Sequence, residues 1–186
     1  MFSVWYLTRA AGLTAYVFLF FATATGLLVS LRLAPQRLRP VLDRIHQAVG
    51  TISIFIVGIH CVVLLLDTHV RFTLLDLFVP FFVADRPREL GAGILAFYTM
   101  IILIGTATLR ARTGFRKLWR KIHRLAIPGF FLVIFHSVAL GTDATEPGIR
   151  SLYIVTAAII TGLIVVKGIV YCRGEKTDTP STREEL

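Results

Sequence analysis

The sequence has few cysteines, few acidic residues and long stretches without charge, and each shortage narrows what the protein can be. Only 2 of its 186 residues are cysteines. There is no C-x-x-C-H sequence, which argues against a covalently attached c-type haem. Acidic residues number 11 against 20 lysines and arginines, which leaves a formal net charge of +9. Charges of either sign are missing from five runs, 10–31, 45–66, 90–109, 125–142 and 151–166.

The length and apolarity of these runs predict membrane-spanning helices. A helix needs about 20 apolar residues to cross a bilayer core of about 30 Å. Hydrophobic residues make up 55% of the chain and the mean hydropathy is +0.74, which is more apolar than a soluble domain. The fifth run is short, but Lys167 can snorkel and extend it to about Cys172. We therefore predict an all-α integral membrane protein, a bundle of five transmembrane helices with residues 1–172 as one domain.

The basic residues predict how this bundle is oriented. Four of the 20 lie in 32–44, seven in 110–124 and four from Lys167 onward. By the positive-inside rule these segments are cytoplasmic, so the N-terminus is outside and the C-terminus inside. Basic residues at the ends of such helices are typical lipid-headgroup anchors, so we expect them to bind the surface of a plasma or inner membrane and not nucleic acid. In this orientation Cys61 and Cys172 lie near opposite ends of their helices and cannot pair.

Four shorter segments carry further predictions. Segment Phe72–Val83 is apolar but too short to span, and it contains Pro80, so we expect it in the outer interface. Pro128-Gly129 should bend the fourth helix, predicted over 122–140. Residues 91–96 fit the dinucleotide pattern G-x-G-x-x-A but open a helix, so we interpret the glycines as packing sites. Residues 173–186 are expected to form a disordered cytoplasmic tail.

Four of the 5 histidines lie in two of the predicted helices, and ionisable residues in a membrane mark function by default. The second helix carries His46 and His60, 14 residues apart, and the fourth carries His123 and His136, 13 apart. These separations are about 21 Å and 19.5 Å along a helix. Both helices run from inside to outside, so His46 should face His123 and His60 should face His136. The fifth histidine, His69, belongs to an outer connection.

Two imidazoles at one depth are what a six-coordinate haem iron needs, with one axial nitrogen from each side. Two haems in one membrane would form a chain of redox centres, and Gly50 and Gly58 would leave room for a flat porphyrin. Core histidines bonded across helices are one alternative. A histidine-lined metal transporter is another, although a metal pathway would normally include carboxylates or thiolates. On a straight helix, a spacing of thirteen residues would point His123 and His136 about 140° apart, so the haem interpretation requires a kink between them.

The chain resembles the ferric reductase-like transmembrane family, which includes NADPH oxidases, metalloreductases and the haem subunit of periplasmic methionine sulfoxide reductase. Both histidine spacings reproduce the ligand spacings of that family. Thr8-Arg9-Ala10-Ala11-Gly12 is similar to the start of an early helix there, and Leu42-Asp43-Arg44 precedes the first ligand helix. The weaker similarities, in the connection typical of bacterial members, are Leu74-Leu75-Asp76, Pro80 and Arg86-Pro87.

The resemblance implies two haem b groups, the inner on His46 and His123 and the outer on His60 and His136, with electrons passing outward. The chain would be the membrane subunit of an oxidoreductase or an electron-transfer cytochrome b. Family members usually have six helices, and the oxidases and reductases carry a flavin and nicotinamide domain after the last; we expect neither here. The electron donor would then be a separate cytoplasmic flavoprotein or ferredoxin, or a quinol, and a redox partner could bind the outer face. A self-contained quinol-dependent metalloreductase is the alternative within the same class.

Three arginines are candidates for neutralising haem propionates, because a guanidinium binds a carboxylate in a bidentate manner. Arg9 belongs to the outer end of the first helix, and Arg44 and Arg124 belong to the inner level. Anchoring to lipid phosphate is the equally simple alternative for each of them.

Overall fold

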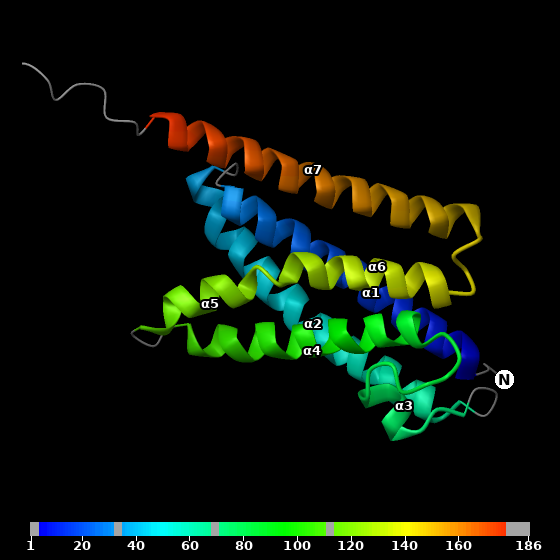
Figure 1. Cartoon of the computed structure of the whole chain (residues 1–186). Helices are drawn as coiled ribbons and strands as arrows, with labels where there is room; N and C mark the ends of the chain where they lie inside the picture. Colours follow the sequence, from blue (N-terminus) through cyan, green and yellow to red (C-terminus); the bar gives the residue numbers. More distant parts are fainter. Residues whose placement is uncertain (1–3, 32–34, 68–70, 111–113, 178–186) are drawn as a thin grey trace, which may run out of the picture.

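The computed structural model describes residues 4–31, 35–67, 71–110 and 114–177, and within them every regular element is a helix. Five helical segments are long and apolar enough to cross a membrane, which confirms the predicted number (Figure 1). The elements in order are α1 (Val4–Leu31), η1 (Gln36–Leu38), α2 (Arg39–Leu65), α3 (Leu74–Phe78), α4 (Pro87–Leu109), α5 (Phe115–His123), α6 (Ala126–Leu140) and α7 (Pro147–Thr177).

Several helices extend beyond the charge-free runs that predicted them. Arg9 lies inside α1, and α2 begins at Arg39 with a proline in its first turn, where a missing N–H costs nothing. α4 likewise begins at Pro87. α7 is helical to Thr177, five residues into the segment predicted as a disordered tail, and residues 178–186 lie outside the described part.

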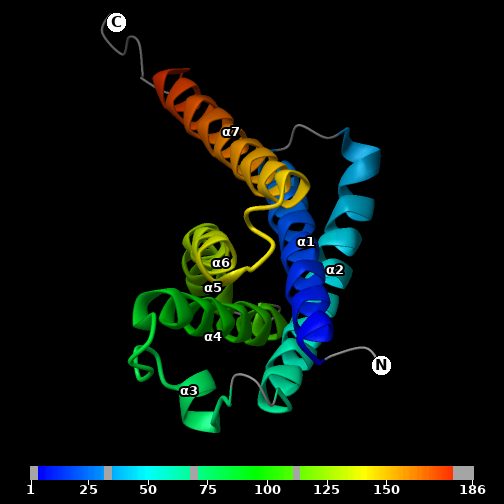
Figure 2. The ribbon, with the colours of Figure 1, turned by 90° about the vertical axis from the view of Figure 1, so that its right-hand side faces the viewer.

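α1 lies at the centre of the bundle and contacts α2, α6 and α7, while α4 packs on α6 (Figures 1 and 2). Between α1, α6 and α7 an aromatic cluster is buried, in which Tyr16 stacks on Phe130 and meets Tyr153 edge-on. The hydroxyl groups of Tyr16 and Thr156 share a hydrogen bond, so this core carries no unpaired hydroxyl there. Phe130, which falls between the two histidine levels, therefore serves ordinary core packing.

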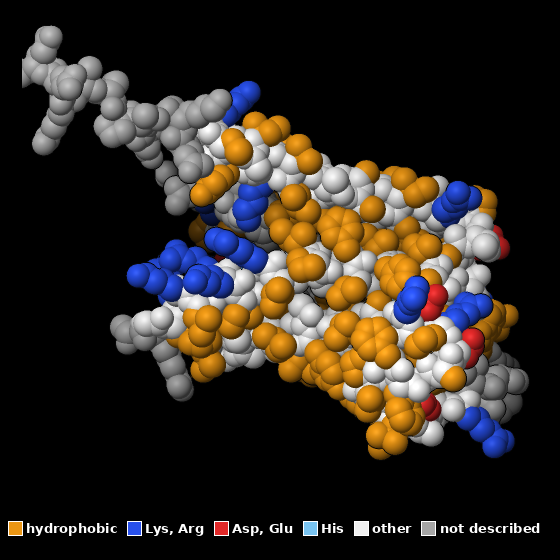
Figure 3. All heavy atoms as spheres, in the orientation of Figure 1, with side chains coloured by type: hydrophobic (Ala, Val, Ile, Leu, Met, Phe, Trp, Pro, Cys, Tyr) orange, Lys and Arg blue, Asp and Glu red, His pale blue; other side chains and the backbone are white. Residues whose placement is uncertain are grey.

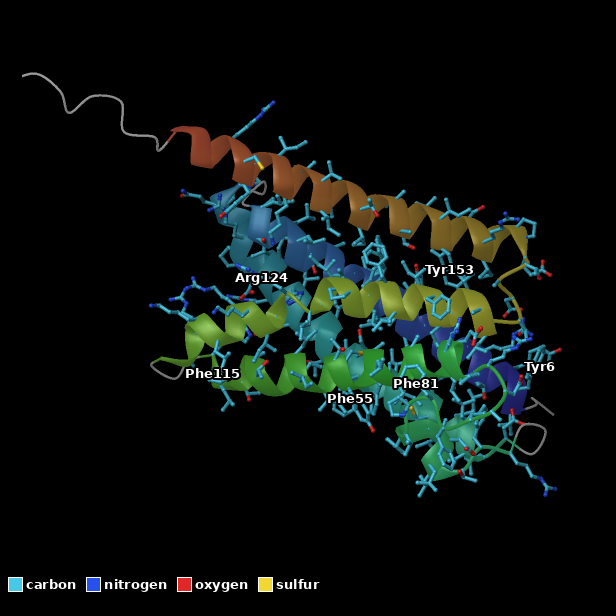
Figure 4. All side chains as sticks on the ribbon, viewed as in Figure 1. Tyr6, Phe55, Phe81, Phe115, Arg124 and Tyr153 are labelled. Carbon is cyan, nitrogen blue, oxygen red and sulfur yellow. The ribbon has the colours of Figure 1, made fainter. Side chains whose placement is uncertain are left out.

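α2 carries a small buried residue midway between its two histidines. Ser53 lies seven residues from each of them and is completely buried. Its hydroxyl donates to the carbonyl oxygen of Val49 at 2.6 Å, which satisfies the polar group inside its own helix. The opposite side of α2 is apolar and open, as the outward-facing Phe55 shows with 69% of its surface exposed (Figure 4). Such a surface suits a lipid environment.

The fourth apolar segment is broken into α5 and α6 at Arg124-Leu125, four residues before Pro128. Proline has no N–H and its ring clashes with the carbonyl four residues earlier, here that of Arg124. That carbonyl instead accepts a bond from Ile127 at 3.3 Å, and the N–H of Leu125 reaches Ile122 at 2.9 Å. These hydrogen bonds join residues three apart, as in a 3-10 helix, and they tighten the chain at the break. The predicted kink is therefore present between the two histidines, but nearer His123 than Pro128-Gly129 suggested.

The apolar segment before α4 forms the short helix α3, which begins with a capping box between Thr73 and Asp76. The segment then turns back on α4, where the Tyr98 hydroxyl donates to the carbonyl of Phe78 and Phe81 contacts Gly91 (Figure 4). Leu74, Leu75, Phe78, Val79, Phe81 and Phe82 remain exposed. This arrangement agrees with a segment that lies against the end of the bundle instead of crossing it.

The two ends of the bundle differ in the charged residues that they carry (Figure 3). One end carries α5, the start of α2 and the end of α7, and its described charges are nearly all lysine and arginine; we call it the basic end. At the opposite end both signs are present, and Arg9 of α1 forms an ion pair with Asp143 in the turn before α7. The ion pair ties α1 to the connection between α6 and α7.

Candidate functional site

The structure brings His46 of α2 and His123 of α5 together near the basic end. Their ring centres are 5.8 Å apart and their planes are nearly perpendicular, at 82°. Nδ1 of His46 lies 2.7 Å from the carbonyl oxygen of Ala22 in α1. His123 is the last residue of α5, immediately before the break. We call these two residues the inner pair.

His60 of α2 and His136 of α6 lie further toward the other end of the bundle, where each contacts a neighbouring helix. Nδ1 of His60 is 3.0 Å from the carbonyl oxygen of Thr8 in α1. Nδ1 of His136 is 2.9 Å from the carbonyl oxygen of Glu89 in α4. These two residues are the outer pair, and each is tied to a neighbouring helix.

The hydrogen bonds fix which ring nitrogen carries the proton in three of the four histidines. A backbone carbonyl oxygen only accepts, so Nδ1 of His46, His60 and His136 must donate. In a neutral imidazole the lone pair is then on Nε2. Histidines that bind metals almost always donate their other ring N–H to a carboxylate, a carbonyl or water. In these three rings Nε2 is therefore the nitrogen whose lone pair is available.

Spacing of the inner pair fits a shared metal ion. Two imidazoles that bind the same metal ion from opposite sides, each at about 2 Å, place their ring centres about 6 Å apart. The observed separation is 5.8 Å. In the described residues no three His, Cys, Asp or Glu side chains gather into a group that could hold a bare metal ion. A donor set of two imidazoles suits a metal whose other four ligands come from a macrocycle.

His123 differs from the other three histidines because its Nδ1 is buried without a hydrogen-bond partner. Its ring stacks on Trp119, with ring centres 5.0 Å apart and planes inclined by 33°. The indole Nε1 of Trp119 is also buried and unpaired, and the Arg110 guanidinium lies 5.8 Å from the centre of that ring. Buried polar atoms without partners are rare. Nδ1 of His123 and Nε1 of Trp119 are therefore available to hydrogen-bond a bound molecule at the inner level.

The three arginines selected from the sequence have different surroundings. Arg9 is engaged by Asp143 and also lies 4.0 Å from the Trp5 ring centre, so its charge already has partners in the protein. Arg44 and Arg124 are exposed at the basic end, and Arg124 lies at the junction of α5 and α6 (Figure 4). A role toward propionates stays a prediction for all three. His69 lies outside the described residues.

Sequence reasoning missed the groups that hold the rings. Thr8, Ala22 and Glu89 act through backbone carbonyls, which no side-chain motif reveals. Trp119 was also missed, although it lies four residues before His123, one helical turn away. Gly50 and Gly58 were expected to leave room for a porphyrin, and a Cβ added at either would meet no atom within 4 Å.

The sequence model of a domain family described as Domain of unknown function (DUF8596) matches residues 3–143. The chain belongs to this family. The DUF8596 match covers α1 to α6 and includes all four histidines of the inner and outer pairs, whereas α7 lies beyond it. No curated protein and no solved structure matches the chain.

Proposed function

We propose that the protein transfers electrons across a membrane through two b-type haems, as the membrane subunit of an oxidoreductase. The observation that carries this proposal is the pairing of four histidines at two levels, with Nδ1 tied to a backbone carbonyl in three of them. Bound at these positions, haem iron would accept and release single electrons. His46 and His123 would hold the inner iron, and His60 and His136 the outer iron.

The protein itself contributes the position and orientation of the ligands. α2 supplies one ligand to each level, and the segment α5–α6 supplies the other. The levels on α2 are about 21 Å apart along its axis, so together they reach across most of a bilayer core. α1 and α4 hold the rings in place through their carbonyl oxygens.

We propose that the basic end faces the cytoplasm of a plasma or inner membrane, which puts the N-terminus outside and the C-terminus inside. The charge separation of Figure 3 supports this orientation through the positive-inside rule. Electrons would then enter at the inner pair and leave from the outer pair to an acceptor on the outer face. The resemblance to ferric reductase-like proteins gives the same direction.

α5 is the proposed docking surface for a cytoplasmic electron donor with an acidic face. Its half-buried side contains Phe115, Trp119 and Ile122. The exposed basic side chains fall within an arc of about 140° around the helix, and they are Arg116, Lys117, Arg120, Lys121 and Arg124. Arg112, another basic residue of this turn, lies outside the described residues. A donor flavoprotein or ferredoxin bound here would be next to His123, at the end of the same helix.

A self-contained quinol-dependent metalloreductase is the second candidate, because an exposed apolar surface is available for a quinol. Six large apolar side chains of segment 74–82 are exposed beside α4, near the outer pair's end of the bundle. A quinol would enter sideways from the lipid and would need no basic docking surface. A histidine-lined metal transporter has less support, because the described residues contain no cluster with enough protein ligands for a bare ion.

Purified full-length protein decides among these readings. Two low-spin haems per chain, extractable with acid acetone, are expected, with sharp bands on reduction. His46→Ala or His123→Ala should leave only the outer haem, and His60→Ala or His136→Ala only the inner one. A haem-free protein would end the proposal, and a full load in His60→Ala would end the pairing.

A further inference from the structure

The three carbonyls that hold the histidine rings share one feature of their helices. In an α-helix each carbonyl accepts a bond from the N–H four residues later. For each of these three, that residue is a glycine. The pairs are Thr8 with Gly12, Ala22 with Gly26, and Glu89 with Gly93. Each carbonyl has a second lone pair, which the imidazole can use without breaking the helix.

The imidazoles lie directly on these glycines, where a side chain would collide with them. A Cβ at Gly12 would be 3.1 Å from Cε1 of His60, and one at Gly26 would be 3.0 Å from Cε1 of His46. At Gly93 the Cβ would be only 2.5 Å from Nδ1 of His136. A larger residue at Gly93 would therefore force the ring of His136 to shift, and one at Gly12 or Gly26 would require the ring there to move by a few tenths of an ångström.

A histidine is not the general neighbour of a helical glycine, because Gly91 meets Phe81, Gly129 meets Thr99 and several other helical glycines face open space. A Cβ added at Gly105 of α4, or at Gly162 or Gly168 of α7, would meet no atom within 4 Å. Spacing supports the same distinction. Gly12 and Gly26 are 14 residues apart on α1, as are His46 and His60 on the antiparallel α2.

We propose that Gly12, Gly26 and Gly93 are positioning residues for the haem ligands. Each one opens the face of its helix, so that a histidine can donate from Nδ1 to a carbonyl and keep Nε2 for the iron. The inference rests on the proposed function, and it adds that three glycines on helices without ligands set the strength of the two haem sites. Gly26 serves the inner site, and Gly12 and Gly93 serve the outer site.

Alanine at these positions should weaken the ligand in a defined direction. The added methyl group pushes the ring away and lengthens its Nδ1–H···O bond. Losing such a supporting partner typically lowers metal affinity about 10- to 100-fold. A weaker bond also makes Nε2 less basic, which disfavours ferric iron and raises the reduction potential. The effect should be largest for Gly93→Ala, whose clash is the most severe.

The test uses the full chain, loaded with haem and purified in nanodiscs, with Gly12→Ala, Gly26→Ala and Gly93→Ala. Gly105→Ala, Gly162→Ala and Gly168→Ala are the matched controls. Haem content, the rate of haem release, the two reduction potentials and the low-spin electron paramagnetic resonance signals are measured for each variant. Gly26→Ala should change the inner signal only, and Gly12→Ala the outer signal only, with release at least about tenfold faster.

The unaffected haem in each variant reports that the bundle is folded, so a folding defect is recognised. If Gly93→Ala does not assemble, the milder Gly12→Ala and Gly26→Ala variants carry the test. Unchanged potentials and release rates in these two, or equal changes in the controls, would overturn the inference while leaving the haem proposal intact. A wild-type protein without haem would instead remove the proposed function on which the inference rests.

Discussion

The inner pair should lose its haem before the outer pair does. The perturbation that isolates each site is a double substitution within one pair. His60→Ala with His136→Ala leaves only the inner site, and His46→Ala with His123→Ala leaves only the outer site. Each protein then reports on one haem, so the two rates of release can be compared in the same bundle.

The size of the difference follows from the hydrogen bonds of the rings. Both outer ligands donate to carbonyls, at 3.0 Å and 2.9 Å. In the inner pair only His46 does so, at 2.7 Å, while Nδ1 of His123 is buried without a partner. One net hydrogen bond is worth about 1 kcal/mol, or about fivefold. Loss of a ligand's supporting partner costs about 10- to 100-fold in affinity. We expect release from the inner site to be about tenfold faster.

Transfer of haem to apomyoglobin measures this release, because the acceptor binds free haem tightly and changes the Soret absorption. Protein in nanodiscs is mixed with excess apomyoglobin, and the transfer is followed for both double variants. Equal rates, or slower release from the inner site, would refute the reasoning from the unpaired Nδ1. A wild-type protein that releases its haems in two phases, the faster of them matching the inner-only variant, would support it.

Three further predictions concern the basic end, the break and the orientation. Haem reduction by a native donor should slow about tenfold as the salt concentration rises from about 0.02 to 0.5 M. It should slow by a similar factor when Arg116, Lys117 and Arg120 are changed to Gln. A reduction rate that responds to neither change points to a quinol as the donor. Pro128→Ala should restore an N–H that joins α5 to α6, turn His123 away and remove the inner haem alone, whereas two retained haems would contradict the role of the break. A cysteine at position 76 should react with an impermeant reagent added outside intact cells, and one at position 116 should not; the reverse pattern would invert the proposed orientation.

Much of the fold could be predicted because charge is the strongest signal in a membrane sequence. Five uncharged runs gave five helices. The errors are at the ends, since Arg9 and Arg39 lie within helices that were expected to begin later. A charge at the edge of a bilayer does not end a helix when it has a partner, as Arg9 has in Asp143. That partner could not be predicted, because the two residues are far apart in the sequence.

The candidate site was partly predictable for a similar reason. Spacing along a helix indicated which histidines share a level, and the structure brings His46 and His123 together at 5.8 Å. The supporting carbonyls could not be predicted from residue types, because every residue has one. Equal spacings of 14 on α1 and α2 were a usable signal, since antiparallel helices with one repeat keep their residues in register. Gly93 was interpreted as a packing site, and its contact turns out to be with a histidine.

The break between α5 and α6 accounts for the geometry of the inner pair and for the weaker haem binding that we predict there. On a straight helix, thirteen residues would point His123 and His136 about 140° apart. Pro128 removes the N–H that the Arg124 carbonyl would accept, so the chain tightens and re-aims before α6 begins. His123 then faces His46 but is the last residue of its helix. There it stacks on Trp119, and its Nδ1 has no hydrogen-bond partner. The other three rings each donate to a backbone carbonyl oxygen. The proposed ligand nearest the proposed docking surface is therefore the one whose ring lacks a carbonyl partner, so we expect donor binding along α5 to act first on the inner site.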